Sequence, residues 1–238
     1  MLDFGTTGRL RFSNLIMYDR QTESWWQQAT GEAIAGEFTG KRLRLYPVTM
    51  IAWGEFAAAY PEGMVLTRDT GYDRNYGRNP YIGYDDITRS PFLYEGRPTP
   101  DGLPAMARVF TIDQPGEAVA YPYAWLEQAR VVHDRVGDQP VVVFWQPGTA
   151  SALDGAFVST GREVGAAAAF NPEHAGEALT FKWDEGQIRD QQTGSSWNAF
   201  GIALHGPLAG ARLEPITGIN HFWFSWAAFR PDTAIYGG

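Results

Sequence analysis

The sequence contains no cysteine among its 238 residues. This absence excludes disulfides, thiolate nucleophiles, iron–sulfur clusters and zinc sites built on sulfur ligands. Basic residues are also scarce, because Lys and Arg total 19 against 27 Asp and Glu, which gives a net charge of −8. Nucleic acids and anionic membrane surfaces require a positive face on the protein, so neither is expected as a partner.

Long hydrophobic runs are missing as well. No apolar run approaches the roughly 18 residues of a membrane span, and Met1–Gly5 has neither the basic nor the apolar region of a signal peptide. The remaining composition, 44% hydrophobic and 19% charged, is typical of a globular protein. Aromatic residues are abundant, with nine Trp and eleven Tyr.

Two parts of the sequence resemble each other. Residues 41–66 align without a gap on residues 211–236, which places Arg42 on Arg212 and Trp53 on Trp223. Further upstream the offset grows by one residue, and residues 19–26 align on residues 190–197. Coinciding Trp and Gly residues in one register predict an internal duplication.

The predicted copies are unequal. Residues 1–66 form a partial first repeat unit that lacks its N-terminal half, residues 67–105 form a Tyr-rich connector, and residues 106–238 form a complete second unit. The first unit has no counterpart of the apolar run Val141–Trp145. We therefore expect an unpaired sheet edge that is covered by the second unit or by a second copy in a homodimer.

Local patterns within the units favour strands. Hairpins are predicted over residues 9–18, with the turn at Ser13 and Asn14, and over residues 178–190. The run 140–145 predicts a buried strand paired with residues 131–134. Short helices are predicted at 52–60, 123–130 and 222–229. The predicted fold class is α+β and mainly β, with internally duplicated strand-rich units covered by short helices.

Longer motifs carry a resemblance to a known family. They are Tyr18–Gln28, Thr30–Ile34, Arg68–Gly77, Gln146–Asp154 and Asn220–Phe229. Together they resemble the bacterial and archaeal family catalogued as domain of unknown function 3179, over essentially the whole chain. The resemblance implies duplicated relatives that are longer and often exported, and it implies no established activity.

One departure from the family bears on chemistry. Many relatives are expected to carry a Cys-Pro-x-Cys motif, whereas Gln146–Gly148 stands in the corresponding place of the second unit here. Metal or redox chemistry based on those cysteines is therefore not expected. The four histidines also lack metal-ligand spacing, so neither a metal nor another cofactor is predicted.

His221 is the leading catalytic candidate. It aligns with Ile51 of the first unit and is followed by the aromatic residues Phe222–Phe224. An apolar environment lowers the pKa of an imidazole and keeps it neutral, as a general base requires. The alternative is a core histidine whose ring is hydrogen-bonded to a backbone carbonyl.

Carboxylates that have no acidic counterpart in the other copy are candidate partners of His221 in acid–base catalysis. These are Glu32, Glu55 and, in the connector, Asp69. The predicted ligand-binding residues are aromatic: Tyr72, Tyr76, Trp53, Trp223 and Trp226.

These residues predict a small-molecule site at the junction of the two repeats. One interpretation is a hydrolase that uses a His–carboxylate pair on a small-molecule substrate. A second is a non-catalytic module with aromatic walls that binds a carbohydrate-like ligand. A third is a structural or assembly protein. The connector either lines the site or joins the two units with its Tyr rings packed on the sheets.

Overall fold

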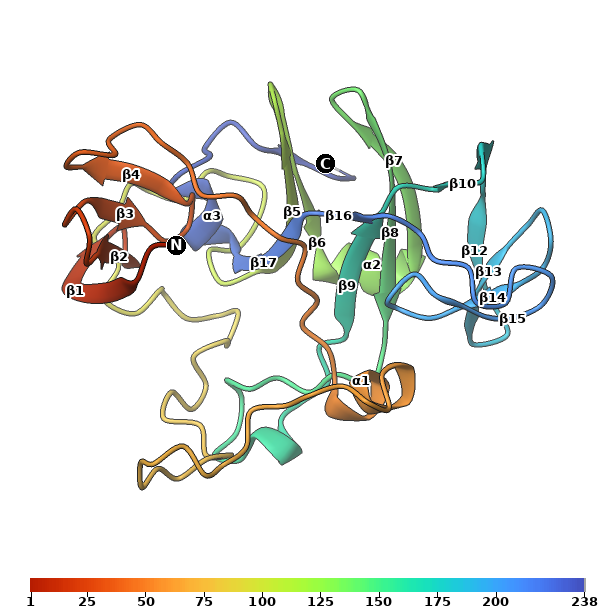
Figure 1. Cartoon of the computed structure of the whole chain (residues 1–238), viewed down its shortest axis with the longest axis horizontal. Helices are drawn as coiled ribbons and strands as arrows, with labels where there is room; N and C mark the ends of the chain where they lie inside the picture. The colour runs from red at the N-terminus through yellow and green to blue at the C-terminus, as the bar shows by residue number, and fades with distance from the viewer. Residues whose placement is uncertain (238) are drawn as a thin grey trace.

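The computed structural model describes residues 1–237, and over this range the chain is mainly β with three short α-helices. The predicted α+β, mainly β class is confirmed. In Figure 1 a red to orange N-terminal sheet and a blue sheet formed by β12–β15 lie at opposite ends of the molecule. Two further sheets lie between them.

The N-terminal sheet is an antiparallel meander. Its strands are β1 (Phe4–Arg11), β2 (Asn14–Asp19), β3 (Trp25–Gln27) and β4 (Glu32–Ala35), paired in that order. Phe12 and Ser13, with φ of 51° and 59°, form the β1–β2 turn. The turn therefore lies one residue earlier than predicted. Helix α1 (Trp53–Ala59) follows after an extended segment.

The central sheets are formed by the C-terminal part of the chain. One has the order β17 (Gly218–Phe222), β5 (Arg108–Gln114), β6 (Glu117–Pro122), β18 (Ala234–Ile235). The other has the order β16 (Pro215–Ile216), β9 (Ala166–Phe170), β8 (Gln139–Gln146), β7 (Val131–Val136). Helix α2 (Tyr123–Ala129) joins β6 to β7, and α3 (Trp223–Ala227) follows β17.

The remaining elements lie between β8 and β16 in the chain. The third sheet has the order β12 (Phe181–Asp184), β13 (Gln187–Asp190), β14 (Ser196–Trp197), β15 (Ala203–His205). Small additions are the 3-10 helix η1 (Val158–Thr160) and the hairpin of β10 (Glu173–His174) and β11 (Glu177–Ala178). The connector 67–105 forms neither a helix nor a strand.

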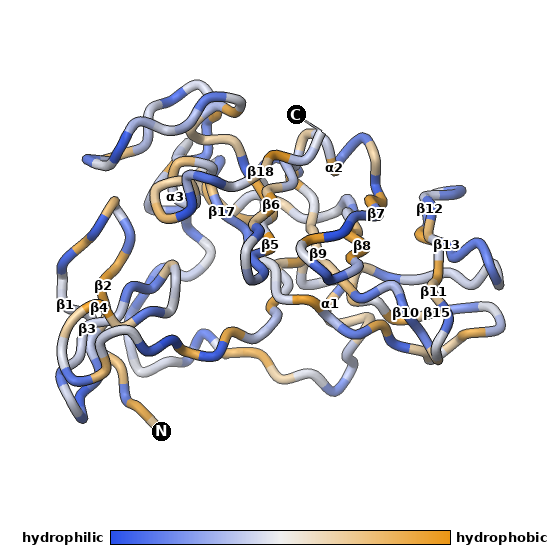
Figure 2. The backbone as a smooth tube through the Cα atoms, turned by 90° about the horizontal axis from the view of Figure 1, so that it is seen from above, coloured by the Kyte–Doolittle hydropathy of each residue, from blue (hydrophilic) through white to orange (hydrophobic). Residues whose placement is uncertain are grey.

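Strand β8 is buried on both faces, as its continuous apolar sequence predicts. Val141, Val143 and Trp145 pack in the core between the two central sheets. Val142 and Phe144 pack in a second core against the β12–β15 sheet. On the outer face of β5 and β6, α3 completes a third core. Figure 2 shows the hydrophobic colour gathered around these central strands.

The turn after β13 is built around a buried carboxylate. Asp190 accepts hydrogen bonds from the Thr193 amide at 2.6 Å and from the Trp197 indole at 2.9 Å. Burial by itself raises the pKa of Asp190, but the hydrogen bonds from Trp197 and Thr193 outweigh it and hold that pKa below its usual value.

The N-terminal sheet contains the same arrangement after β2. Asp19 accepts from the Thr22 amide at 2.7 Å and from the Trp26 indole at 2.9 Å. In each turn the threonine and a following serine, Ser24 in the first and Ser195 in the second, lie 2.7 Å apart between hydroxyl oxygens. The two turns are thus closed by the same hydrogen bonds.

Replacement of Asp190 by alanine should lower the free energy of unfolding by about 1–3 kcal/mol. The reason is that the Trp197 indole N–H would stay buried without an acceptor. Chemical denaturation of D190A measures the loss. The neighbouring Gln191→Ala, at an exposed side chain, is the control and should change stability by no more than about 0.5 kcal/mol. Equal stability of D190A and Q191A would contradict the role assigned to this carboxylate.

Candidate functional site

A cavity of about 760 Å³ lies where the N-terminal sheet meets the β17–β5 sheet and α3. The first sheet contributes residues from the β1–β2 turn and from β4, and the opposite wall comes from β5, β17 and the end of α3. This junction cavity has the volume of a typical small-molecule site.

Positive charge dominates the wall of the junction cavity. It is lined by the arginines Arg11, Arg42, Arg97 and Arg230, against the two acids Glu32 and Asp113. Arg42 pairs with Glu32 at 3.1 Å, and Arg230 pairs with Asp113 at 2.6 Å. Arg11 and Arg97 form no ion pair with any of residues 1–237. The cavity thus has two surplus arginines in a chain whose net charge is −8.

Asp113 lies in a setting that penalises its charge. Burial raises the pKa of its carboxyl above the usual value, and the positive charges of Arg230 and Arg42 offset only part of this effect. The Nε of Arg230 is buried and has no hydrogen-bond partner among the described residues. One donor of this guanidinium is therefore left unused by the protein.

Aromatic rings supply the apolar part of the wall. Phe12 and Phe229 meet edge to face with ring centroids 5.5 Å apart. The Arg11 guanidinium lies 5.2 Å from the Phe12 ring and 5.7 Å from the Phe229 ring, distances typical of cation–π contacts. Trp226 completes this side. The cavity thus combines guanidinium groups with flat apolar surface.

His221, the leading catalytic candidate, lies on β17 opposite Val109 of β5. Its ring is 5.1 Å from the ring of Trp226, and its Nε2 is enclosed without a hydrogen-bond partner within residues 1–237. Burial lowers the pKa of His221 to about 4, so the imidazole is neutral at pH 7. His221 is half-buried and is not among the residues that line the cavity.

The other predicted site residues are dispersed. Glu32 and Trp226 line the junction cavity. Trp223 is in the core, where its indole donates to the Pro100 carbonyl at 3.2 Å. Glu55 and Trp53 are on α1, where the Glu55 carboxylate accepts from Gln146 at 2.8 Å. Three others are exposed on the connector: Asp69, Tyr72 and Tyr76.

Sequence reasoning missed the arginines. They come from β1, the segment after β4, the connector and the segment after α3. No spacing in the chain relates these four positions, so only the packing of the two walls brings them together. Searching for histidines and carboxylates could not have found a guanidinium cluster.

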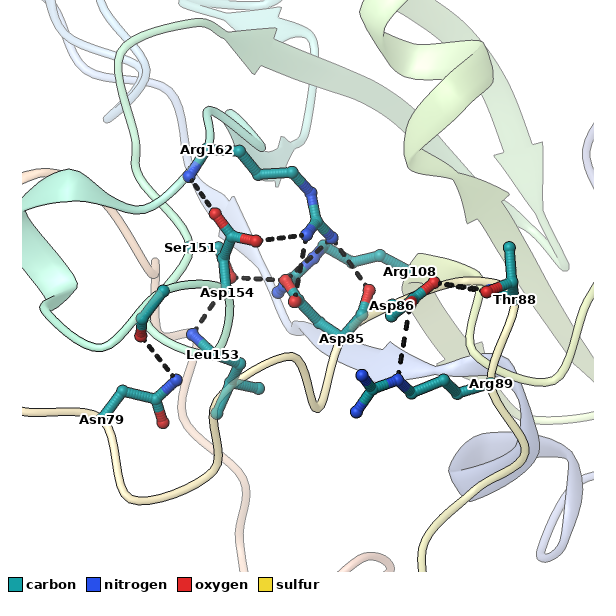
Figure 3. A network of polar contacts seen from close by, with 11 residues as sticks. Asn79, Asp85, Asp86, Thr88, Arg89, Arg108, Ser151, Leu153, Asp154 and Arg162 are labelled. Atoms are coloured by element: carbon teal, nitrogen blue, oxygen red, sulfur yellow. Dashed lines mark hydrogen bonds and ion pairs between the residues drawn. The ribbon is translucent and has the colours of Figure 1, made fainter.

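A second polar cluster joins the connector to the central sheets (Figure 3). Asp85, buried to 2% exposure, accepts from Arg108 of β5 at 3.2 Å and from Arg162 at 2.9 Å. The Ser151 hydroxyl donates to the same carboxylate. Because two cations and a hydroxyl already engage Asp85, this cluster anchors the connector and leaves no free base for catalysis.

The model of the family described as "Protein of unknown function (DUF3179)" matches residues 1–233. The chain belongs to this family. Comparisons with curated proteins and with solved structures each found no match. Membership in DUF3179 identifies no activity, so the function has to be argued from the site itself.

Within residues 1–237 of this DUF3179 protein, no group of three or more His, Asp or Glu side chains converges as metal ligands would. None of the helices in the same range has the length and hydrophobicity that crossing a membrane requires.

His221→Phe should make the stability less dependent on pH. A histidine whose pKa falls from its ordinary 6.5 to about 4 on folding takes up its proton preferentially when unfolded. Stability is therefore lost as the pH falls from about 6.5 to about 4. Between pH 7 and pH 4.5 the free energy of unfolding should fall in both proteins, and the fall should be about 2–3 kcal/mol smaller in H221F than in the original protein.

Denaturation curves at both pH values test this expectation. The same substitution at the exposed His205 is the control for replacing a histidine by phenylalanine. An H221F protein with the pH dependence of the original would contradict the burial of a neutral imidazole.

Asp85→Asn should loosen the connector. The substitution leaves Arg108 and Arg162 without their shared carboxylate, at a cost of about 2–3 kcal/mol in local stability. Limited proteolysis should then cut residues 67–105 faster. Asp86→Asn removes an exposed pair with Arg89 and should leave the cleavage rate nearly unchanged. Similar rates in both variants would contradict the anchoring role.

Proposed function

We propose that this DUF3179 protein binds a small organic anion in the junction cavity. The single observation that carries the proposal is the pair of arginines, Arg11 and Arg97, that line the cavity without an ion pair. A guanidinium group presents a planar fork of donors that matches a carboxylate or phosphate. The ligand accordingly carries such a group and an apolar body that packs on the aromatic rings.

We further infer that the cavity lies between two copies of one repeated unit. The alignment of Arg42 with Arg212 and Trp53 with Trp223 supports this inference, and so do the equal hydrogen bonds in the Asp19 and Asp190 turns. The cavity would then lie where the sheet of the partial first unit meets the β17–β5 sheet and α3 of the second unit.

Binding without turnover is favoured over hydrolysis. Of the three carboxylates predicted as partners of His221, only Glu32 lines the junction cavity, and it is already paired with Arg42. The Nε2 of His221 is enclosed and bonded to nothing among residues 1–237. A general base needs access to the proton that it removes. A neutral carbohydrate-like ligand would leave the surplus arginines unused.

Calorimetric titration with benzoate and phenyl phosphate tests the proposal. Both should bind, and the neutral benzyl alcohol should bind at least tenfold more weakly. Arg97→Ala should weaken the anions about ten- to a hundredfold, because one charge-assisted hydrogen bond contributes about 1.5–3 kcal/mol. Arg74→Ala, an exposed arginine on the same connector, is the control for net charge.

Three outcomes would contradict the proposal. Equal binding of the neutral and anionic probes would favour the carbohydrate-like alternative. Equal losses in R97A and R74A would place the anion elsewhere. Turnover of phenyl phosphate or phenyl acetate that disappears in H221F would favour the hydrolase.

A further inference from the structure

The junction cavity has a counterpart elsewhere in the molecule. The cavity lies where the β1–β4 sheet meets α3 and the residues that follow this helix. In the same way, the β12–β15 sheet meets the end of α1. The ring of Phe200, between β14 and β15, lies edge to face 5.2 Å from the ring of Tyr60, which directly follows α1. We call this contact the closed junction.

The sheet side of the closed junction has the same backbone as the sheet side of the cavity. Gly31 and Gly201 align, and both have φ of 67°. The carbonyl of each accepts a hydrogen bond from the amide twelve positions later, at 2.8 and 2.9 Å. The residues directly before these two glycines are Thr30, which lines the cavity, and Phe200. These two residues therefore correspond.

The helix sides correspond as well. Tyr60 aligns with Arg230, and the amide of each donates to the carbonyl four residues earlier, at 2.9 and 3.0 Å. An arginine of the sheet is present in both junctions. Arg42 lines the cavity, and the aligned Arg212 has its guanidinium 5.8 Å from the centroid of the Tyr60 ring. An arginine at this position is thus compatible with an aromatic ring beside it.

The two junctions differ in their side chains. In the closed junction an aromatic ring fills the space beside the helix end, since Phe200 packs on Tyr60. The corresponding residues of the cavity are Thr30 and Arg230, and neither carries a ring. Threonine in place of phenylalanine leaves the space of a whole ring, and arginine in place of tyrosine puts a guanidinium next to that space. A guanidinium attracts the face of an aromatic ring.

We propose that the ligand of the junction cavity is an aromatic anion, and that its ring takes the place that Phe200 fills in the closed junction. The inference deepens the proposed anion site, and it rests on that proposal and on the inferred duplication. The ring packs beside Thr30 and against the guanidinium of Arg230. The two surplus arginines of the cavity bind the anionic group. Thr30 determines the specificity for a ring, because a larger side chain would fill the same space.

Two carboxylates of equal charge and similar size test the preference for a planar ring. In calorimetric titration of the full protein, the Kd of benzoate should be about three- to tenfold lower than that of cyclohexanecarboxylate, since a guanidinium attracts an aromatic ring more strongly than a saturated one. Equal Kd values would overturn this inference and leave the anion site standing. Binding of neither acid would overturn both proposals.

A substitution that gives the cavity the side chain of the closed junction tests the place of the ring. Thr30→Phe should weaken benzoate binding about tenfold or more, because its own ring occupies the space of the ligand. Thr39→Phe, at an exposed threonine in the turn after β4, is the matched control and should leave the Kd nearly unchanged. Unfolding curves check that both variants fold. Equal Kd values in T30F and T39F would overturn the proposal.

A measurement on the original protein locates the ring without filling the cavity. With methyl-labelled threonine, nuclear Overhauser effects should connect the ring protons of benzoate to the methyl group of Thr30. The conservative Thr30→Ser, which keeps the hydroxyl and removes this methyl group, identifies the signal and should still bind benzoate. Effects confined to Thr111 or Thr217, which line the same cavity, would place the ring elsewhere and overturn the proposal.

Discussion

Burial of β8 on both faces is the constraint on which the rest of the structure depends. A strand with Val141 and Val143 on one face and Val142 and Phe144 on the other has to be covered from two sides. The β17–β5–β6–β18 sheet covers one side, and the β12–β15 sheet covers the other. The outer face of the first of these sheets packs against α3. The layers on this side of β8 are therefore the β17–β5–β6–β18 sheet and then α3.

The connector is positioned by charge as well as by apolar packing. Burial removes the water molecules that would hydrate the Asp85 carboxylate, and Arg108, Arg162 and Ser151 replace them as partners. Burial of this charge is favourable only when all three partners are in place. Further along, the Pro100 carbonyl accepts from the Trp223 indole, and the Tyr94 ring packs on Phe224 at 5.1 Å. These contacts hold the segment that contains Arg97 against the junction cavity. The polar cluster around Asp85 and the cavity wall at Arg97 are therefore formed by different parts of one connector.

Much of the secondary structure could be predicted from the sequence because its causes are local. The β12–β13 hairpin, strand β8 and all three helices lie close to the predicted positions. Alternation of apolar residues, turn residues with positive φ and the prolines that follow α1 and α3 act within a few residues. The β1–β2 turn lies one residue before its predicted position, since Phe12 and Ser13, and not Asn14, adopt the left-handed conformation.

The site could be predicted only in part. The sequence by itself determined the α+β class, the likeness of residues 19–26 to residues 190–197, which form the two related turns, and membership in DUF3179. The tertiary structure decided that Arg11 and Arg97 share a wall, because residues distant in the chain meet only when whole sheets pack. It also decided that Trp223 is buried while Trp53 is exposed. The two aligned segments each form a short helix that begins at a tryptophan, but the burial of that tryptophan depends on which other elements pack against it.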